Sequence, residues 1–300
     1  MSEVTVVIAT RNRAATLRRT VGRLLELPER PQVIVVDNGS AGGPAVCPPE
    51  VLVLPLRRNL GAVARNHGAA VADTPLVAFA DDDSWWAPGA LDRAAGIFAG
   101  HPRLGLLAGH VLVGDDERTD PVSAFMATAP LGAADDLPGP SVLGFLACAA
   151  VVRREAFLGV GGFDPVVRFM GEEERVAYDL FTAGWGLAYR ADVVAHHHPR
   201  AGADDTGKRV LTARNRVLTA WLRRPLRVAV GATAALLRAA PGDPVARRAA
   251  VQLAARLPRA LVGRRPAGPD LEAAIERLAA GTTAPTSSPS SPRRSRSAAR

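Results

Sequence analysis

Three consecutive carboxylates, Asp81, Asp82 and Asp83, follow the apolar run 76–80. Adjacent carboxylates at the end of a buried segment repel one another strongly unless a cation neutralises them. Carboxylate oxygens are the ligands that hard divalent cations such as Mg²⁺ prefer, and such cations commonly bind the phosphate groups of a substrate. The triplet therefore predicts a metal-dependent enzyme that acts on a phosphorylated compound.

Short apolar runs alternate with helical patterns in the part of the chain that must position these carboxylates. The strand candidates are residues 4–9, 32–36, 51–55, 76–80 and 104–113. The helix candidates between or after them are residues 17–25, 61–72 and 88–98. This alternation predicts an α/β fold in which helices sandwich a Rossmann-like, mostly parallel sheet.

Polar side chains gather where the strand candidates end. Thr10 and Arg11 follow the first strand, Asp37 the second and Asn59 the third, and Arg65 comes a few residues later. Each of these residue types alone is more often part of a turn. Together they predict a ligand site, because ligands of parallel sheets bind beyond the carboxyl ends of the strands. Asp37 can accept hydrogen bonds from a base or ribose, and Arg65 can pair with a phosphate or an aspartate.

The motifs resemble a known family in their order and spacing. The donor-binding half of the family 2 glycosyltransferases is similar to this chain at residues 6–12, 35–40, 59–66 and 81–83. The resemblance continues through residues 161–164, 171–174 and 184–185 and covers roughly residues 4–198. It implies the A-type nucleotide-diphospho-sugar transferase fold. It also implies metal-dependent, inverting transfer of a sugar from a nucleotide-diphospho-sugar to a hydroxyl of a glycan, a lipid or a small molecule.

The same resemblance implies a donor site with a metal ion. Thr10, Asp37 and Arg65 are expected at the nucleotide, and Arg11 and Asn59 at the same nucleotide-sugar site. The aspartate triplet stands where the family has its Asp-x-Asp motif.

Within that motif, Asp82 is expected near the ribose, and Asp83 as the principal ligand of Mg or Mn, helped by Asp81. In related transferases a histidine after the last strand can approach the metal or the diphosphate, so one of the histidines 196–198 is expected to complete the site, with His198 as the first candidate. A histidine-rich turn without a ligand role is the alternative reading of that run.

The resemblance also points to a catalytic base. In the family this base is the Asp of a Glu-Asp pair that opens a helix, and the spacing from Gly171 to Gly184 places Glu173 at that position. Here Glu replaces Asp and is flanked by Glu172 and Glu174, so the base stays open among the three, with Glu172 as the second candidate. Neighbouring carboxylates raise a pKa, which favours proton acceptance. An acidic first turn that complements the helix dipole is the structural alternative.

The acceptor side is predicted from aromatic and small residues. Trp85 and Trp86 follow the triplet, and one is expected in the core and the other at the cleft, where it can stack on a sugar. Cys148 lies in the segment 144–150, which resembles the small-residue lining of the family's acceptor side. The connection 114–140 is long, which predicts a lid or an acceptor-facing excursion.

The chain divides by composition into three parts. Residues 1–205 are the predicted catalytic domain, 206–281 a basic helical extension and 282–300 a disordered basic tail rich in Ser, Pro and Arg. Residues 206–300 hold 19 of the 37 Lys and Arg but 4 of the 29 Asp and Glu. Contact with an anionic membrane surface is therefore expected, and the alternative is an arginine-rich composition that merely solvates helices. Prolines are expected to end or kink the C-terminal helices at positions 225, 241, 244 and 258.

Several other classes are disfavoured. Cys47 and Cys148 lack the spacing of a zinc site, and no secretory signal or span of about 20 apolar residues is visible, so a cytoplasmic enzyme, peripheral on the inner membrane face, is expected. Nucleic acid is not an expected partner. A nucleotidyltransferase would need a glycine-rich phosphate loop after the first strand, where residues 10–13 contain no glycine. A non-catalytic protein that binds nucleotide-sugars or anionic surfaces would not need all of these carboxylates.

Overall fold

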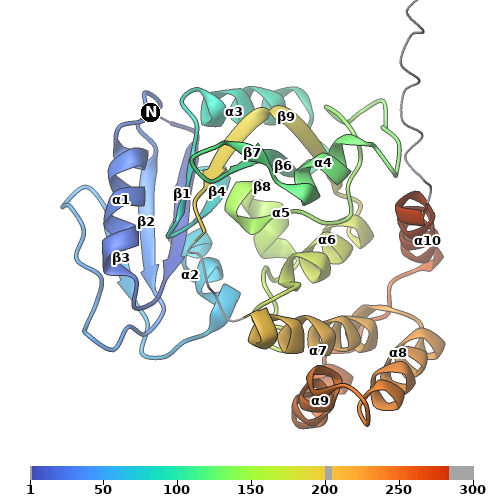
Figure 1. Cartoon of the computed structure of the whole chain (residues 1–300). Coiled ribbons are helices and arrows are strands. Elements are labelled where there is room, and N and C mark those ends of the chain that lie inside the picture. The colour runs from blue at the N-terminus through green and yellow to red at the C-terminus, as the bar shows by residue number, and fades with distance from the viewer. Residues whose placement is uncertain (1, 200–204, 284–300) are drawn as a thin grey trace, which may run out of the picture.

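A mixed nine-stranded sheet forms the centre of the computed structural model, which describes residues 2–199 and 205–283 (Figure 1). Eight strands follow one another in the order β3-β2-β1-β4-β8-β6-β9-β5, and β7 pairs with β6 at the side of this path. The strands are β1 (Val4–Thr10), β2 (Gln32–Asp37), β3 (Leu52–Pro55), β4 (Leu76–Asp81), β5 (Ser84–Trp86), β6 (Leu104–Val113), β7 (Arg118–Thr119), β8 (Ala150–Arg153) and β9 (Gly186–His197). The prediction of an α/β fold with a largely parallel sheet is confirmed.

The parallel half of the sheet brings the predicted polar residues to one edge. β1 pairs in parallel with β2 and β4, so that Thr10 lies opposite Asp37 and Ala9 lies opposite Asp81. β3 extends this half beyond β2, with Pro55 opposite Asp37. The carboxyl ends of β1, β2 and β4 therefore meet, as the strand pattern predicts.

The other half of the sheet contains strands that the sequence pattern does not reveal. β8 lies antiparallel between β4 and β6, and β5 pairs antiparallel with β9. β8 has four residues and β5 has three, too few for a period of two to be recognised. β9 runs parallel to β6 and ends at His197, beside the aspartate triplet.

Two helical layers cover the sheet. The helices of residues 2–199 are α1 (Ala14–Leu25), α2 (Ala64–Val71), α3 (Ala90–Gly100), α4 (Pro121–Ala127), α5 (Arg154–Gly159) and α6 (Glu172–Thr182), with the 3-10 turns η1 (Gly61–Val63) and η2 (Ala147–Ala149). Val6 and Ile8 of β1 pack against α1 and α3, whereas Val7 packs with residues of α2, α5 and α6. Because successive side chains point to opposite faces and both faces are covered, β1 is buried along almost its whole length and is mostly apolar.

Four C-terminal helices extend this body. They are α7 (Asp205–Arg223), α8 (Leu226–Ala239), α9 (Pro244–Val262) and α10 (Pro269–Thr283). α7, α8 and α9 share a core with Val166 and Val167, and α10 places Leu271 and Ala274 against Leu143 and Tyr178 (Figure 1). Residues 205–283 are thus packed onto residues 2–199.

The predicted helix breaks agree in part with the structure. Pro225 precedes α8 and Pro244 opens α9, but Pro258 lies inside α9 and does not end it. Thr282 and Thr283 belong to α10, and the rest of the predicted tail, residues 284–300, lies outside the described residues. In the part of the chain that is described, no helix is both long and apolar enough to cross a bilayer.

The contact between α2 and the sheet depends on a glycine. A Cβ added to Gly68 would lie 2.4 Å from Val7 Cγ1, whereas one added to Gly96 on α3 meets no described atom within 4 Å. We expect Gly68→Ala to lower the free energy of unfolding by about 1–3 kcal/mol through overpacking. The matched change Gly96→Ala should raise it by about 0.5–1 kcal/mol, because alanine is the better helix former. Urea denaturation measures both, and equal effects of the same sign would contradict the packing argument.

Candidate active site

The aspartate triplet forms a tight turn between β4 and β5. Asp82 and Asp83 are buried, and the side chain of Asp81 is one-third exposed. The backbone N–H of Asp81 donates to Ser84 Oγ at 2.7 Å, and Thr20 Oγ1 donates to the carbonyl oxygen of Asp82 at 2.8 Å. The turn is therefore held from both sides, by β5 and by α1.

Two arginines neutralise the triplet. Arg13 lies 2.6 Å from an oxygen of Asp82 and 2.7 Å from one of Asp83, while Arg65 pairs with Asp81. Burial raises the pKa of Asp82 to about 6, against the hydrogen bond from Thr10 and the charge of Arg13. Burial also acts to raise the pKa of Asp83, but hydrogen bonds from His197 and Arg13 bring it below its ordinary value. Sequence reasoning missed Arg13, although it lies in the polar run that follows the first strand.

One histidine of the run 196–198 reaches the carboxylates. His197 Nε2 lies 3.5 Å from Asp83 Oδ1, and ligand atoms of Asp81, Asp83 and His197 lie within 4.8 Å of one another. The predicted ligand His198 instead has its ring 4.6 Å from that of Trp85 and its Nδ1 3.3 Å from Asp115. His196 and His198 lie on the side of Trp85 and His197 on the side of Asp83, because neighbouring side chains of an extended segment point to opposite faces.

A polar pocket of about 670 Å³ surrounds this cluster. It brings together most of the predicted donor residues and Glu173. The pocket is lined by Ala9, Thr10, Arg11, Arg13, Asn38, Asn59, Gly61, Ala62, Arg65, Asp81, Asp82, Asp83, Phe169, Met170, Glu173, His197, Pro199 and Lys208. Asp37 does not line it. The buried carboxylate of Asp37 accepts hydrogen bonds from the backbone N–H groups of Ser40 and Ala45, both at 2.8 Å, which stabilise the loop after β2.

The C-terminal extension shapes one wall of this pocket. Asn215 of α7 is 1% exposed, and its amide donates to the carbonyl oxygens of Phe169 at 2.5 Å and Met170 at 2.7 Å. Met170 has a φ of +69°, a backbone conformation that non-glycine residues rarely adopt. Gly171 follows as the N-cap of α6, so Asn215 fixes the segment that leads directly into the glutamate run.

The three glutamates at the start of α6 have different surroundings. Glu172 is 2% exposed, and its Oε2 has no hydrogen-bond partner among the described residues. Burial, reinforced by the charge of Glu173, raises the pKa of Glu172 to about 8. Glu174 accepts a hydrogen bond from the Tyr178 hydroxyl at 2.5 Å. Glu173 alone lines both the polar pocket and a second pocket, and burial raises its pKa as well.

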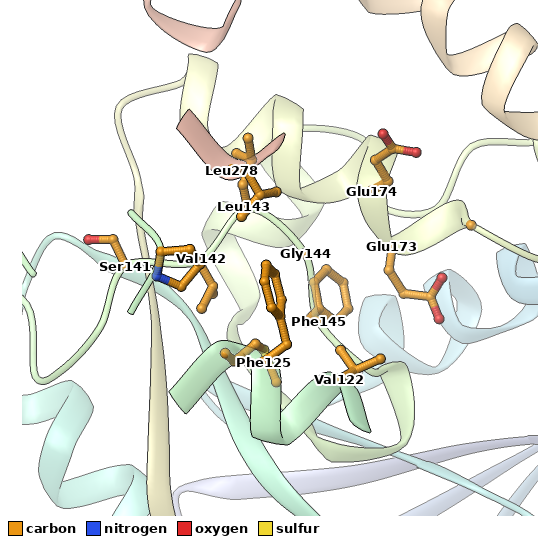
Figure 2. Close-up of a pocket in the computed structure, with 13 residues that line it drawn as sticks. Val122, Phe125, Ser141, Val142, Leu143, Gly144, Phe145, Glu173, Glu174 and Leu278 are labelled. Carbon is orange, nitrogen blue, oxygen red and sulfur yellow. The ribbon is translucent and has the colours of Figure 1, made fainter. Parts of the chain in front are cut away.

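The second pocket is apolar and has a volume of about 270 Å³ (Figure 2). It is lined by Val122, Phe125, Met126, Pro130, Ser141, Val142, Leu143, Gly144, Phe145, Gly171, Glu173, Glu174 and Leu278. α4, which lies in the long connection predicted as a lid or acceptor-facing excursion, supplies three of these residues. Of its lining residues, Gly144 and Phe145 belong to the segment 144–150, which the sequence analysis assigned to the acceptor side, and the other apolar ones were not named there.

Trp85, Trp86 and Cys148, which were singled out for the acceptor side, do not line this pocket. Trp86 is fully buried in the core and Cys148 is buried, with a pKa raised well above its ordinary value by burial. Trp85 stacks on His196 and lies under Arg23, on the α1 side of the sheet. Trp86 is thus in the core, whereas Trp85 packs at the edge of the same core and lies away from both pockets.

Residues 5–160 match the family model described as Glycosyl transferase family 2. The chain belongs to this family. It is 37% identical over 209 residues to the pre-mycofactocin glycosyltransferase of Mycobacterium tuberculosis, covering 65% of this chain and 43% of that protein. It is 28% identical over 274 residues to the N-acetylglucosaminyl-diphospho-decaprenol L-rhamnosyltransferase of the same organism, covering 76% and 89%. The chain therefore spans less than half the length of the first of these two relatives.

Solved structures of other glycosyltransferases share the fold. The mannosyltransferase PcManGT of Pyrobaculum calidifontis, in complex with GDP-Man and Mn²⁺, superimposes with a TM-score of 0.55 at 20% identity, over 94% of this chain and 76% of that chain. GalNAc-T7 with UDP, GalNAc and Mn²⁺ gives a TM-score of 0.57 at 17% identity, over 75% and 49%. These similarities confirm the predicted A-type glycosyltransferase fold.

The buried carboxyl of Glu172 makes stability depend on pH. Its pKa is about 8 in the folded protein and 4.5 ordinarily, so between these values the folded state holds a proton that the unfolded state has lost. We expect the free energy of unfolding to fall as the pH rises through this window, by up to about 1.4 kcal/mol per pH unit. Glu172→Gln should make this slope shallower, since the amide stays neutral. Urea denaturation across the window measures the slope, with Glu155→Gln, an exposed position on α5, as the control; an unchanged slope in Glu172→Gln would refute the assignment.

Proposed function

We propose that this chain is a metal-dependent, inverting glycosyltransferase that moves a sugar from a nucleotide-diphospho-sugar to a hydroxyl of an acceptor. The observation that carries the proposal is the place of Glu173 in the walls of both pockets. A donor in the polar pocket and an acceptor in the apolar pocket would meet at this carboxylate. Family membership supports the reaction class.

The residues present fit a divalent cation. Asp81 and Asp83 offer carboxylate oxygens and His197 an imidazole nitrogen, with all three ligand atoms within 4.8 Å of one another. Carboxylates suit Mg²⁺ and Mn²⁺, and an imidazole ligand favours Mn²⁺ of the two. When bound, the cation would neutralise the negative charge that grows on the leaving nucleoside diphosphate.

The other polar residues act on the donor. Thr10, Arg11 and Asn59 lie where the nucleotide would bind, and Lys208 of α7 adds a positive charge to the same pocket. Arg13 pairs with Asp82 and Asp83, and so keeps these buried carboxylates ionised and in place.

Glu173 is the proposed base. Its carboxylate would take the proton of the acceptor hydroxyl as the oxygen attacks the anomeric carbon, on the side opposite the leaving diphosphate, which inverts the configuration. Its raised pKa makes it a stronger proton acceptor than an exposed glutamate. Glu174 is engaged by Tyr178, and Glu172 lines neither pocket, so both fit the role less well.

The extension is proposed to rest on an anionic membrane surface from the cytoplasmic side. Leu226, Val230 and Leu237 form an exposed stripe on α8, with exposed fractions of 50–57%. Arg227 and Arg238 are exposed beside it. Apolar residues flanked by arginines on a helix suit the interface of an anionic bilayer. In this arrangement residues 1–205 are the catalytic domain and 206–281 the surface-contacting extension.

Removing the base should abolish turnover without abolishing donor binding. We expect Glu173→Gln to lower kcat by about 10²–10⁴-fold, because the amide cannot accept the proton. Glu174→Gln should cost far less, since it changes a group already bonded to Tyr178. Release of nucleoside diphosphate from a panel of nucleotide-sugars measures turnover, and the anomeric configuration of the product tests inversion. Equal losses in the two variants, or retention of configuration, would overturn the assignment.

The metal assignment predicts unequal roles for neighbouring histidines. We expect His197→Gln to weaken Mn²⁺ binding at least about tenfold, because it removes a ligand. His198→Gln should leave binding close to wild type, since that ring packs on Trp85 instead. Calorimetric titration with Mn²⁺ and with Mg²⁺, without donor, measures both affinities. A larger effect at His198 would restore the prediction made from the sequence.

A further inference from the structure

The apolar pocket beside Glu173 is built from three segments far apart in the sequence. α4 contributes Val122 and Phe125, the segment 141–145 contributes Val142, Leu143 and Phe145, and α10 contributes Leu278 (Figure 2). These side chains converge on the hollow, with Glu173 at its edge. A group that reaches Glu173 from this side is therefore surrounded by aliphatic and aromatic carbon.

Few polar side chains are available in this pocket. Besides Glu173 its polar lining side chains are Ser141 and Glu174, and Glu174 already accepts a hydrogen bond from Tyr178. A sugar ring carries several hydroxyl groups, and each one buried without a partner is unfavourable. The pocket therefore suits a molecule with a single hydroxyl group, which lies at Glu173, and with no other hydroxyl groups to bury.

The pocket also limits the size of that molecule. Its volume of about 270 Å³ is less than half that of the polar pocket, about 670 Å³. A second hollow, of about 740 Å³ between α7, α8 and α10, shares Phe125, Glu174 and Leu278 with it. An acceptor too long for the first pocket would thus extend past these three residues into the second hollow.

We propose that the acceptor's reacting hydroxyl is carried by an apolar alkyl, prenyl or aryl body that binds in this pocket, and not by a sugar ring. The inference rests on the proposed function, because it names the acceptor class of the same site. The C-terminal tail of the chain itself is a poor occupant, since residues 284–300 contain only Ala, Pro, Thr, Ser and Arg.

Gly144 offers a way to fill the pocket. A Cβ added there meets no described atom within 4 Å, so a larger side chain is accommodated in open space (Figure 2). The matched control is Gly96 on the exposed side of α3, where an added Cβ is equally free. Gly144→Leu and Gly96→Leu thus add the same atoms, inside and outside the pocket.

The test combines direct binding with transfer. Binding of octanol, phenylbutanol and methyl glucoside is followed by ligand-observed NMR, and transfer from the donor found in the nucleotide-sugar panel is measured with the same three acceptors. We expect the two apolar alcohols to bind and to be glycosylated in preference to the glucoside. Gly144→Leu should weaken their binding at least about tenfold, because displacing two methylene-sized groups already costs that factor, whereas Gly96→Leu should not.

The possible outcomes distinguish a wrong acceptor class from a wrong proposed function. Preferred transfer to methyl glucoside, with turnover that depends on Glu173, would leave the proposed function standing and overturn the acceptor class. Binding of octanol that Gly144→Leu abolishes, without any donor consumption, would support the pocket assignment and overturn the function. Absence of both binding and transfer of the apolar alcohols would overturn the inference.

Discussion

The neutralisation of three carboxylates at the end of a buried strand constrains the whole active-site half of the molecule. Buried charges are tolerated when they are paired, and removing a partner leaves an uncompensated charge in a medium of low polarity. Arg13 reaches the triplet from the segment after β1, and Arg65 reaches it from α2. Both approaches require the parallel register of β1 with β4 and the close packing of α2 on the sheet. The ion pairs of the triplet with Arg13 and Arg65 therefore make the geometry of the site depend on the packing of the sheet and α2.

The parallel half of the sheet could be predicted because its strands are buried on both faces. β1, β2 and β4 are continuous apolar runs that end in polar residues, and both features are local. β8 could not be predicted in the same way, because its four residues form a strand only through their pairing with β4 and β6 on either side. Pro258 shows the limit of a local rule as well, since tertiary packing keeps α9 continuous through it.

In the site, the residues that lie at strand ends could be predicted more easily than those whose role depends on which face of a strand their side chain points to. Thr10 and the aspartate triplet follow from their positions at strand ends, whereas Glu173 follows from the resemblance to the family. His197 and His198 are adjacent, and which of them faces Asp83 depends on the irregular pairing of β9 with β6, where the register shifts after Gly109. The apolar pocket as a whole could not be predicted, because Phe125, Leu143 and Leu278 meet only when α4 packs on β6 and β9 and α10 packs on α6.

The contacts of the basic extension give many of its arginines a structural role. Many of its arginines are internal: Arg223 pairs with Asp179 of α6, Arg224 pairs with Glu272, and Arg256 donates to the carbonyl oxygen of Val166 at 2.6 Å. The charge imbalance of residues 206–300 therefore does not measure surface potential alone. Asn215 donates to two residues that line the polar pocket, and Leu278 lines the apolar pocket. Helices that composition marks as an appendage therefore help to build the site that begins at the aspartate triplet. A substitution inside the extension can thus alter catalysis without touching any charged surface.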